Sequence, residues 1–155
     1  MYGGRSLEGI NRNSLGLLDS NIAVYALVKD YPTKIIHKKC LKLIERALKG
    51  EINRVLCLNP ITVIETFSAL AKLLDLVEAE YRASSLLRSE RLGFLTISRS
   101  ASESAVTWAK ESEVPVNDAM IASLAVEHSA IVYTADEKHF DKLKKFGVKF
   151  QNPTK

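Results

Sequence analysis

The sequence predicts an α/β fold: a three-layer sandwich in which a parallel sheet of about four or five strands is flanked by helices. Two observations carry this prediction. Short apolar segments of strand length, such as residues 15–18 and 130–134, alternate with longer segments whose apolar residues recur at helical spacing. Both of these strands end close to an aspartate, Asp19 or Asp136, and a helix-like pattern follows. Buried parallel strands joined by right-handed helical crossovers have this appearance.

Turn and capping residues divide the rest of the chain. The expected strands are 15–18, 54–58, 94–97, 130–134 and 148–150, and the expected helices are 22–28, 33–49, 59–74, 77–91, one containing Trp108, one beginning at Asn117, and 137–145. Residues suited to helix N-termini are Thr33, Asn59 with Pro60, Ser100 with Glu103 in a capping box, and Asn117. Apolar periodicity predicts inward faces made of Ile64, Phe67, Ala71 and Leu74 in one helix and of Tyr81, Leu86 and Leu87 in the next.

Length and composition indicate one globular domain. The chain has 155 residues, of which 46% are hydrophobic and 26% charged. We expect a flexible leader at 1–14, the folded domain at 15–151 and a short tail at 152–155. No segment has the length of a membrane span and the N-terminus lacks the order of a signal peptide, so a cytoplasmic protein with reduced, buried Cys40 and Cys57 is expected.

The net charge of +4 is a mild basic excess, which is compatible with a nucleic-acid partner without establishing one. Lysines and an arginine cover one face of the predicted helix 33–49. That face is either an ordinary solvated surface or an electrostatic footprint for phosphate groups, and the sequence leaves both readings open.

Acidic side chains recur where a parallel sheet would bring them together. Asp19 and Asp136 follow predicted strands, and Glu65 and Asp118 lie in the opening turns of predicted helices. Because crossover helices begin at the edge where strands end, all of these side chains can converge on one edge of the sheet. Each acid alone could be a helix cap or a solvated residue. Together they predict a metal site, since like charges ~4 Å apart repel by about 4 kcal/mol at an effective dielectric constant near 20, and oxygen ligands suit Mg²⁺ or Mn²⁺.

Other chemistries find less support in the sequence. No glycine-rich phosphate loop of the GxGxxG or GxxxxGK type occurs, and Ser20 lacks a GxSxG frame. The histidines, His37, His128 and His139, belong to different predicted helices, so we expect ordinary surface histidines and no histidine-based RNA cleavage.

The segments GLLDSN, ITVIETFSAL, VNDAMIASLA and IVYTADEKHF together resemble the PIN domain, and most closely the VapC-type toxins of toxin–antitoxin pairs. The resemblance covers residues 15–150. It implies a parallel sheet between helices and Mg²⁺- or Mn²⁺-dependent cleavage of single-stranded or looped RNA, in which water attacks the phosphodiester and leaves a 3′-hydroxyl and a 5′-phosphate. A homodimer and an antitoxin protein that blocks the site are implied as well.

The resemblance also implies roles for particular residues. The catalytic and metal-binding acids would be Asp19, Glu65, Asp118 and Asp136, and the supporting residues would be Ser20, Asn21 and Thr134. In one place the chain departs from the family pattern. Many relatives have a further aspartate two residues after the fourth acid, whereas Lys138 and His139 precede Phe140 here. A fifth acidic ligand is therefore in question.

Two rival classes of function use similar folds. A signalling receiver or aspartyl-phosphate phosphotransferase also places acids at strand ends, but position 21 is asparagine, where the phosphotransferase pattern has a second aspartate. A catalytically inactive nucleic-acid-binding or scaffold protein would depend on the basic faces alone. Within the nuclease class, an RNA-processing enzyme without a toxin role is a further alternative.

Overall fold

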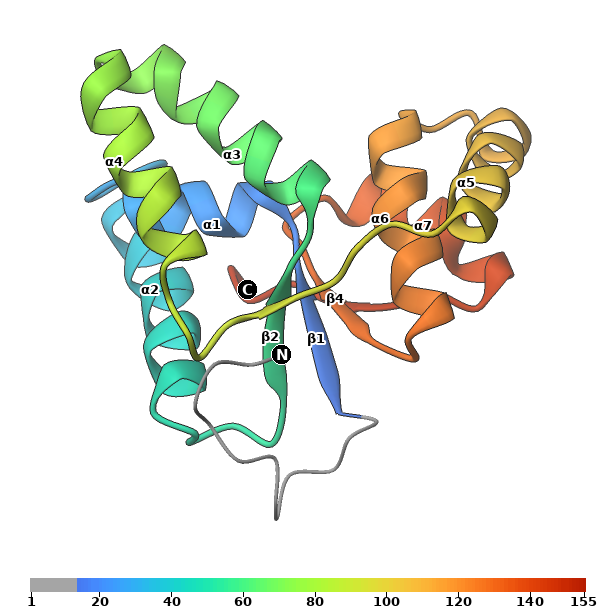
Figure 1. Cartoon of the computed structure of the whole chain (residues 1–155), viewed down its shortest axis with the longest axis horizontal. Coiled ribbons are helices and arrows are strands. Elements are labelled where there is room, and N and C mark those ends of the chain that lie inside the picture. Colours follow the sequence, from blue (N-terminus) through green and yellow to red (C-terminus); the bar gives the residue numbers. More distant parts are fainter. Residues whose placement is uncertain (1–13) are drawn as a thin grey trace.

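A five-stranded parallel sheet forms the centre of the computed structural model, which describes residues 14–155 (Figure 1). The strand order is β3-β2-β1-β4-β5. The strands are β1 (Leu15–Leu18), β2 (Val55–Leu58), β3 (Gly93–Phe94), β4 (Ile131–Tyr133) and β5 (Lys149–Gln151). Four of them lie within one residue of their predicted ends, whereas β3 has only two residues and ends three residues before the predicted Ile97. The predicted class of fold is confirmed. The expected leader at 1–14 lies outside the described residues except for Ser14.

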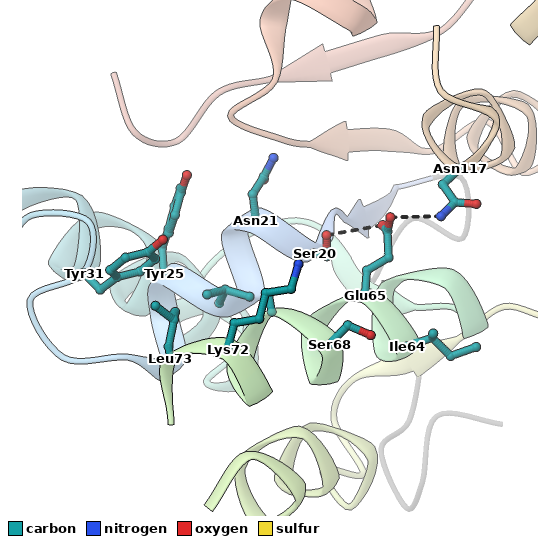
Figure 2. A pocket seen from close by; sticks show the side chains of 12 residues that line it. Ser20, Asn21, Tyr25, Tyr31, Ile64, Glu65, Ser68, Lys72, Leu73 and Asn117 are labelled. Atoms are coloured by element: carbon teal, nitrogen blue, oxygen red, sulfur yellow. Dashed lines mark hydrogen bonds between the residues drawn. The ribbon is translucent and has the colours of Figure 1, made fainter. Parts of the chain in front are cut away.

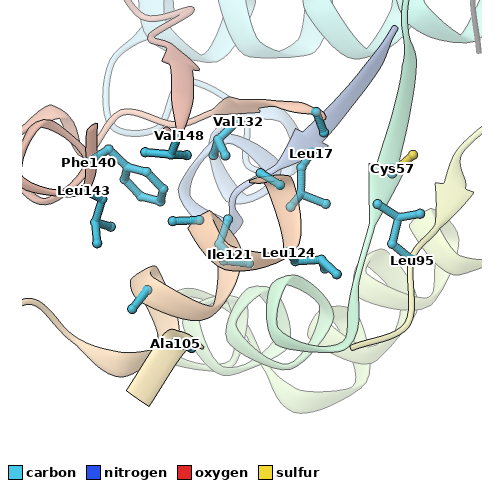
Figure 3. Packing of buried hydrophobic residues seen from close by; sticks show 14 of the residues in the cluster. Leu17, Cys57, Leu95, Ala105, Ile121, Leu124, Val132, Phe140, Leu143 and Val148 are labelled. Carbon is cyan, nitrogen blue, oxygen red and sulfur yellow. The ribbon is translucent and has the colours of Figure 1, made fainter. Parts of the chain in front are cut away.

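Helices cover both faces of the sheet (Figure 1). They are α1 (Ser20–Leu27), α2 (Lys34–Leu48), α3 (Pro60–Leu73), α4 (Leu76–Leu87), α5 (Arg99–Ser112), α6 (Val116–Glu127) and α7 (Glu137–Leu143), and a 3₁₀ turn (Lys144–Phe146) follows α7. Successive side chains of β1 point to opposite faces. Leu17 joins the core beneath α5, α6 and α7, where Phe140 is also buried (Figure 3), while Leu18 joins the core beneath α1 and α2. The three layers therefore follow from strands that are apolar on both faces.

The chain reverses direction across the sheet beside β1. From β1 it winds to β2 and β3 on one side, and it then returns to β4 and β5 on the other. In the registers of these pairs, Leu17 lies beside Cys57 of β2 and Leu18 beside Tyr133 of β4. The C-terminal ends of β1 and β4 are thus adjacent at the point where strand order reverses, and open α/β sheets bind ligands at such points.

Gly16 allows the close approach of side chains above β1. A Cβ atom at this position would lie 2.6 Å from Tyr133 Cε2 and 2.9 Å from Leu56 Cδ2. Real Cβ atoms do not come so close to other heavy atoms, so any larger residue would displace the Tyr133 ring or the strand. The glycine inside this otherwise apolar strand is explained by packing rather than by an unusual backbone conformation.

Two of the predicted helix caps are confirmed and two are wrong. Thr33 accepts a hydrogen bond from the Ile36 N–H, and Asn59 accepts from the first turn of α3. Ser98, not Ser100, caps α5, because its hydroxyl accepts from the Ala101 N–H. The N-cap of α6 is Pro115, so the Asn117 side chain is not used as a cap. It is available for another contact.

The predicted inward faces of α3 and α4 are largely wrong. Ile64 is 63% exposed and Tyr81 is 64% exposed, and Phe67 and Leu87 also lie at the surface. The face of α3 that is buried carries Thr62, Thr66 and Leu70, a spacing of four residues that includes two hydroxyls. Apolar periodicity missed this face because the polar threonines point inward. The surface of α3 and α4 therefore carries a group of apolar side chains: Ile64, Phe67, Leu73, Leu76, Val77, Tyr81 and Leu87.

Both cysteines are buried, as expected. Within residues 14–155, no helix combines the length and the apolar character that a membrane span requires.

Candidate metal centre

Asp19 lies at the junction of β1 and α1 and is almost completely buried, with 3% of its surface exposed. Its Oδ1 accepts a hydrogen bond of 2.8 Å from the Ser20 N–H at the start of α1. Its Oδ2 accepts one of 2.7 Å from the hydroxyl of Thr134, which follows β4. Both carboxylate oxygens are thus held in place by neutral donors from two adjacent strand ends.

Thr134 connects two of the predicted acids. Its hydroxyl donates to Asp19 and accepts a hydrogen bond of 3.0 Å from the Asp136 N–H. Asn21 strengthens the same junction, because its Oδ1 accepts from the Ala135 N–H at 3.1 Å. The three residues that we expected to support the site, Ser20, Asn21 and Thr134, therefore all contact the segments that carry the acids.

Glu65 reaches the same region from the second turn of α3 (Figure 2). Its Oε1 accepts from the Ser20 hydroxyl at 3.3 Å, and its Oε2 accepts from the Asn117 side-chain amide at 3.0 Å. Asn117 belongs to the first turn of α6 and directly precedes Asp118. The amide that sequence reasoning treated as a helix cap instead joins α6 to Glu65.

Asp118 and Asp136 meet at the ring of His139. The Nδ1 atom of His139 lies 2.7 Å from Asp118 Oδ2 and 2.6 Å from Asp136 Oδ2. The other oxygen of Asp136 accepts from the His139 N–H at 3.1 Å and caps α7. The expectation that His139 is an ordinary surface histidine was wrong. Its position three residues after Asp136 was the available signal, since residues so spaced share a helix face.

These contacts bring all of the predicted acids together, and we call Asp19, Glu65, Asp118 and Asp136 the acidic cluster. Burial, together with the nearby carboxylates of Asp118 and Glu65, raises the pKa of Asp19 to about 7, against the lowering effect of the hydrogen bonds from Thr134 and Ser20. Burial and the neighbouring Asp136 raise the pKa of Asp118 to about 6, although His139 acts in the opposite direction. Among residues 14–155, no lysine or arginine forms an ion pair with the acidic cluster.

The donor atoms of this site suit a divalent cation. One ligand atom each from Asp118, Asp136 and His139 lies within 4.8 Å of the other two. The oxygens of Asp19 and Glu65 accept one hydrogen bond apiece and keep lone pairs for a further partner. A hard cation such as Mg²⁺ or Mn²⁺ prefers carboxylate oxygens, and it would offset both the burial of these negative charges and their mutual repulsion, the two causes that raise these pKa values.

A cavity of about 690 Å³ adjoins the acidic cluster. Glu65 and Asn117 line one end, Lys72 extends over its middle, and Tyr25 and Tyr31 line the other end (Figure 2). The rings of the two tyrosines are 5.9 Å apart, centroid to centroid. From one end to the other, the cavity is therefore lined by the carboxylate of Glu65, the ammonium group of Lys72 and the rings of the two tyrosines.

These observations define an α/β protein with an acidic site at the C-terminal ends of adjacent parallel strands. The model of the PIN domain family matches residues 16–146. The chain belongs to the PIN-domain family. The comparison with curated protein sequences returned no significant match.

Several solved structures share this fold at low sequence identity. The structure of VapBC2 from Rickettsia felis, bound to a DNA fragment from its promoter, matches with a TM-score of 0.68 and 21% identity over 89% of this chain and 98% of that chain. VapBC-1 from nontypeable Haemophilus influenzae matches with a TM-score of 0.64 and 22% identity over 91% and 99%. VapC20 from Mycobacterium tuberculosis, described as a Sarcin-Ricin loop cleaving toxin, matches with a TM-score of 0.65 and 15% identity over 81% and 93%.

Proposed function

We propose that this chain is an Mg²⁺- or Mn²⁺-dependent endoribonuclease and the toxin of a toxin–antitoxin pair. The observation that carries the proposal is the acidic cluster itself. Distant segments of the chain contribute Asp19, Glu65, Asp118 and Asp136, and no lysine or arginine in the described part of the chain pairs with them. Membership of the PIN-domain family and the similarity in fold to VapC-type toxins support the same conclusion.

In this proposal the acidic cluster holds the cation. A bound divalent ion lowers the pKa of an attacking water and neutralises charge on the phosphodiester. Hydrogen bonds from neighbouring residues hold the carboxylates of Asp19 and Glu65 in a fixed arrangement. Thr134 and the Ser20 N–H fix both oxygens of Asp19, while Asn117 and the Ser20 hydroxyl fix those of Glu65. Because these donors are neutral, they orient the acids without cancelling the charge that attracts the cation.

The cavity beside the cluster supplies room for the RNA strand. Its volume is sufficient for the nucleotide next to the scissile phosphate, and its tyrosines offer faces on which a base can stack. Lys72 lies between these rings and Glu65, where a backbone phosphate would pass (Figure 2). A single strand fits this order of groups, whereas the bases of a duplex would be paired with each other rather than stacked on the tyrosines.

The proposal includes protein partners and a cytoplasmic location. The similar structures from Rickettsia felis and Haemophilus influenzae are VapBC assemblies, and we extend an antitoxin partner to this chain by analogy.

We also propose a homodimer formed through the exposed apolar group on α3 and α4, where Leu76 and Val77 are 67% and 81% exposed. Large apolar side chains with this degree of exposure are often found at protein interfaces.

The test compares Asp118→Asn with the unmodified chain on single-stranded and hairpin RNA, in Mn²⁺, in Mg²⁺ and in EDTA. We expect cleavage in the presence of either ion, none in EDTA, and none by Asp118→Asn. Asp141→Asn is the matched control, because Asp141 is an exposed acid of α7 that pairs with Lys144 and not with the cluster. Undiminished cleavage by Asp118→Asn, or cleavage in EDTA, would refute the metal-dependent mechanism.

A second measurement separates a toxin from a processing enzyme. Expression of the unmodified chain in a bacterial host should arrest growth, and Asp118→Asn should relieve the arrest. Cleavage of RNA without any effect on growth would support an RNA-processing nuclease instead. Binding of RNA without cleavage under any metal condition would support the non-catalytic alternative.

A further inference from the structure

We propose that His139 is a direct metal ligand, that its Nδ1 atom completes a binding site with Asp118 and Asp136, and that it shifts the preference of the site from Mg²⁺ towards Mn²⁺. The inference deepens the proposed nuclease function and rests on it for the biological use of the metal. Its physical basis is independent of RNA, because it concerns only how these three side chains meet.

The geometry at Nδ1 is that of ligands around a cation rather than that of an ordinary hydrogen bond. Carboxylate oxygens of two residues approach this one nitrogen, at 2.7 Å from Asp118 and 2.6 Å from Asp136. A ring nitrogen has either one proton or one lone pair, so it cannot form a linear hydrogen bond to both oxygens. Neighbouring ligands of an octahedral ion with bonds near 2.1 Å are about 3 Å apart. Each of the two nitrogen–oxygen distances needs to lengthen by only a few tenths of an ångström to match neighbouring ligands of such an ion, and the three atoms already lie within 4.8 Å of one another.

The backbone of α7 holds the imidazole in this position. The His139 N–H donates to Asp136 Oδ1, which leaves Asp136 Oδ2 directed at the ring. The next residue, Phe140, is fully buried and packs beside Leu143 and Val148 (Figure 3). A helix anchored by a core phenylalanine keeps the preceding side chain near the acids. Preorganised ligands lose less entropy on binding an ion than mobile ones do.

The site is open on one side. The exposed fractions of the side chains are 29% for His139, 15% for Asp118 and 28% for Asp136. Water or a phosphate oxygen can therefore fill the remaining coordination positions, as Mg²⁺ and Mn²⁺ sites require. Imidazole nitrogen binds transition metals more strongly than it binds Mg²⁺, which prefers oxygen. A nitrogen ligand in an otherwise carboxylate site should thus favour Mn²⁺.

The competing interpretation is that His139 is only a counter-ion for the two acids. In that case the imidazole occupies the place of the metal and must be displaced when an ion binds. The two interpretations predict opposite results when the ring is removed. If His139 is a ligand, removal of its ring should weaken metal binding. If His139 is only a counter-ion, removal of its ring should strengthen metal binding.

The experiment uses the full chain and the metal ions alone. Mn²⁺ affinity is measured by electron paramagnetic resonance of free Mn²⁺, and Mg²⁺ affinity by calorimetry, for the unmodified chain, His139→Ala and His128→Ala. His128 is the matched control, because it follows the last turn of α6 and lies about 15 Å along the helix from Asp118. We expect His139→Ala to weaken Mn²⁺ binding by roughly tenfold or more, to change Mg²⁺ binding much less, and His128→Ala to change neither.

Pulsed electron paramagnetic resonance gives a direct second readout. A nitrogen bound to Mn²⁺ modulates the electron spin echo, and this modulation should be present in the unmodified chain, lost in His139→Ala and retained in His128→Ala. If His139→Ala does not fold, as judged by circular dichroism, His139→Gln replaces it and should lose the same signal. Unchanged or tighter Mn²⁺ binding by the variant, or absence of nitrogen modulation in the unmodified chain, would overturn the proposal.

The outcome is separable from that of the nuclease proposal. Nitrogen modulation that depends on His139, in a chain that cleaves no RNA, supports the ligand and refutes the nuclease. Metal-dependent cleavage by a chain whose Mn²⁺ shows no nitrogen modulation supports the nuclease and refutes the ligand.

Discussion

The two sides of the acidic cluster are held by different means. On one side, Asp19 and Glu65 receive hydrogen bonds from neutral donors, namely Ser20, Thr134 and Asn117. On the other side, Asp118 and Asp136 share the single imidazole of His139. The first side is fixed by backbone and side-chain groups of α1, α6 and the residue that follows β4. The second side depends on one residue of one short helix.

Asp19 and Asp136, which belong to different sides of the cluster, also differ in their exposure to solvent. Asp19 is 3% exposed, and its position is set at the junction between adjacent strands. Asp136 is more open, with 28% of its side chain exposed. In the proposed metal site, the buried Asp19 would hold a cation with little rearrangement, and the more open Asp136 would allow water or substrate phosphate to exchange. Variants on the two sides should therefore affect stability and metal binding differently.

The largest effect is expected for Asp19→Asn. Loss of this carboxylate should reduce RNA cleavage by on the order of 10³-fold, because a buried oxygen of the proposed metal site and the charge that would attract the cation are both removed. The metal-free protein should nevertheless become more stable above pH 7. The raised pKa of about 7 means that the ionised form of Asp19 costs on the order of 4 kcal/mol there. RNA digestion and urea unfolding in EDTA measure the two effects.

A loss of cleavage that is accompanied by a loss of stability would contradict this explanation. Such a result would mean that the Asp19 carboxylate stabilises the metal-free fold, contrary to its raised pKa. Asp141→Asn, on the surface of α7, controls for the removal of one negative charge.

The next largest effect is a pH dependence of the metal-free protein. Asp19 has a pKa of about 7 and Asp118 of about 6 in the folded chain, both raised mainly by burial, whereas an unfolded aspartate titrates near 3.8. Between these values the folded chain binds more protons than the unfolded chain. Its free energy of unfolding should therefore fall as pH rises from about 4 to about 7, and then level off.

Unfolding in urea at several pH values, in EDTA, tests this dependence. Saturating Mn²⁺ should remove most of the decline above pH 6, because the ion binds the ionised carboxylates of the folded chain only. Stability in EDTA that rises steadily between pH 4 and pH 7 would show that the acidic cluster does not dominate the titration.

The sheet was predicted well from the sequence because short apolar segments that are bounded by acids and turn residues are compatible with few structures other than buried strands. The convergence of the acids at one edge of the sheet was predicted for a related reason: each acid follows a strand or lies in an early turn of a helix, and parallel pairing aligns those positions. The exposed face of α3 was not predicted. Thr62 and Thr66 are buried there, and periodicity assigned the neighbouring apolar residues to the core.

His139 and Asn117 were missed for a different reason. Their roles depend on where α6 and α7 lie relative to each other and to α3, and local sequence contains no information on that packing. Asn117 resembled a cap because it begins an apolar run, but Pro115 occupies the cap position. Once the helices are placed, its amide lies 3.0 Å from Glu65. An asparagine at position 117 could be expected to form a polar contact, but only the tertiary structure shows that its partner is Glu65.

A smaller effect is expected for Thr134→Val, which removes a hydroxyl while keeping the shape of the side chain. Asp19 Oδ2 and the Asp136 N–H would both lose a partner. We expect cleavage to fall by roughly 10- to 100-fold and stability to fall by about 2 kcal/mol. Cleavage assays and urea unfolding measure these changes.

Thr66→Val is the matched control. Thr66 is as buried as Thr134, but among the described residues its hydroxyl has no hydrogen-bond partner. The same substitution should leave stability unchanged or slightly increased, because a buried unpaired hydroxyl is replaced by a methyl group. Equal losses of stability in the two variants would show that volume and shape, rather than the Thr134 hydrogen bonds, determine the result.

The smallest effect is expected for Asn117→Ala on the neutral-donor side of the cluster. The variant removes the 3.0 Å hydrogen bond to Glu65 Oε2, but the Ser20 hydroxyl still contacts Oε1. A partly exposed hydrogen bond contributes about 1 kcal/mol, so we expect roughly a fivefold loss of cleavage at limiting Mn²⁺. Asn117→Asp should lose more, because a carboxylate beside Glu65 repels it instead of orienting it. If both variants lose the same activity, the amide acts only by its bulk, and the neutral donors do not orient Glu65.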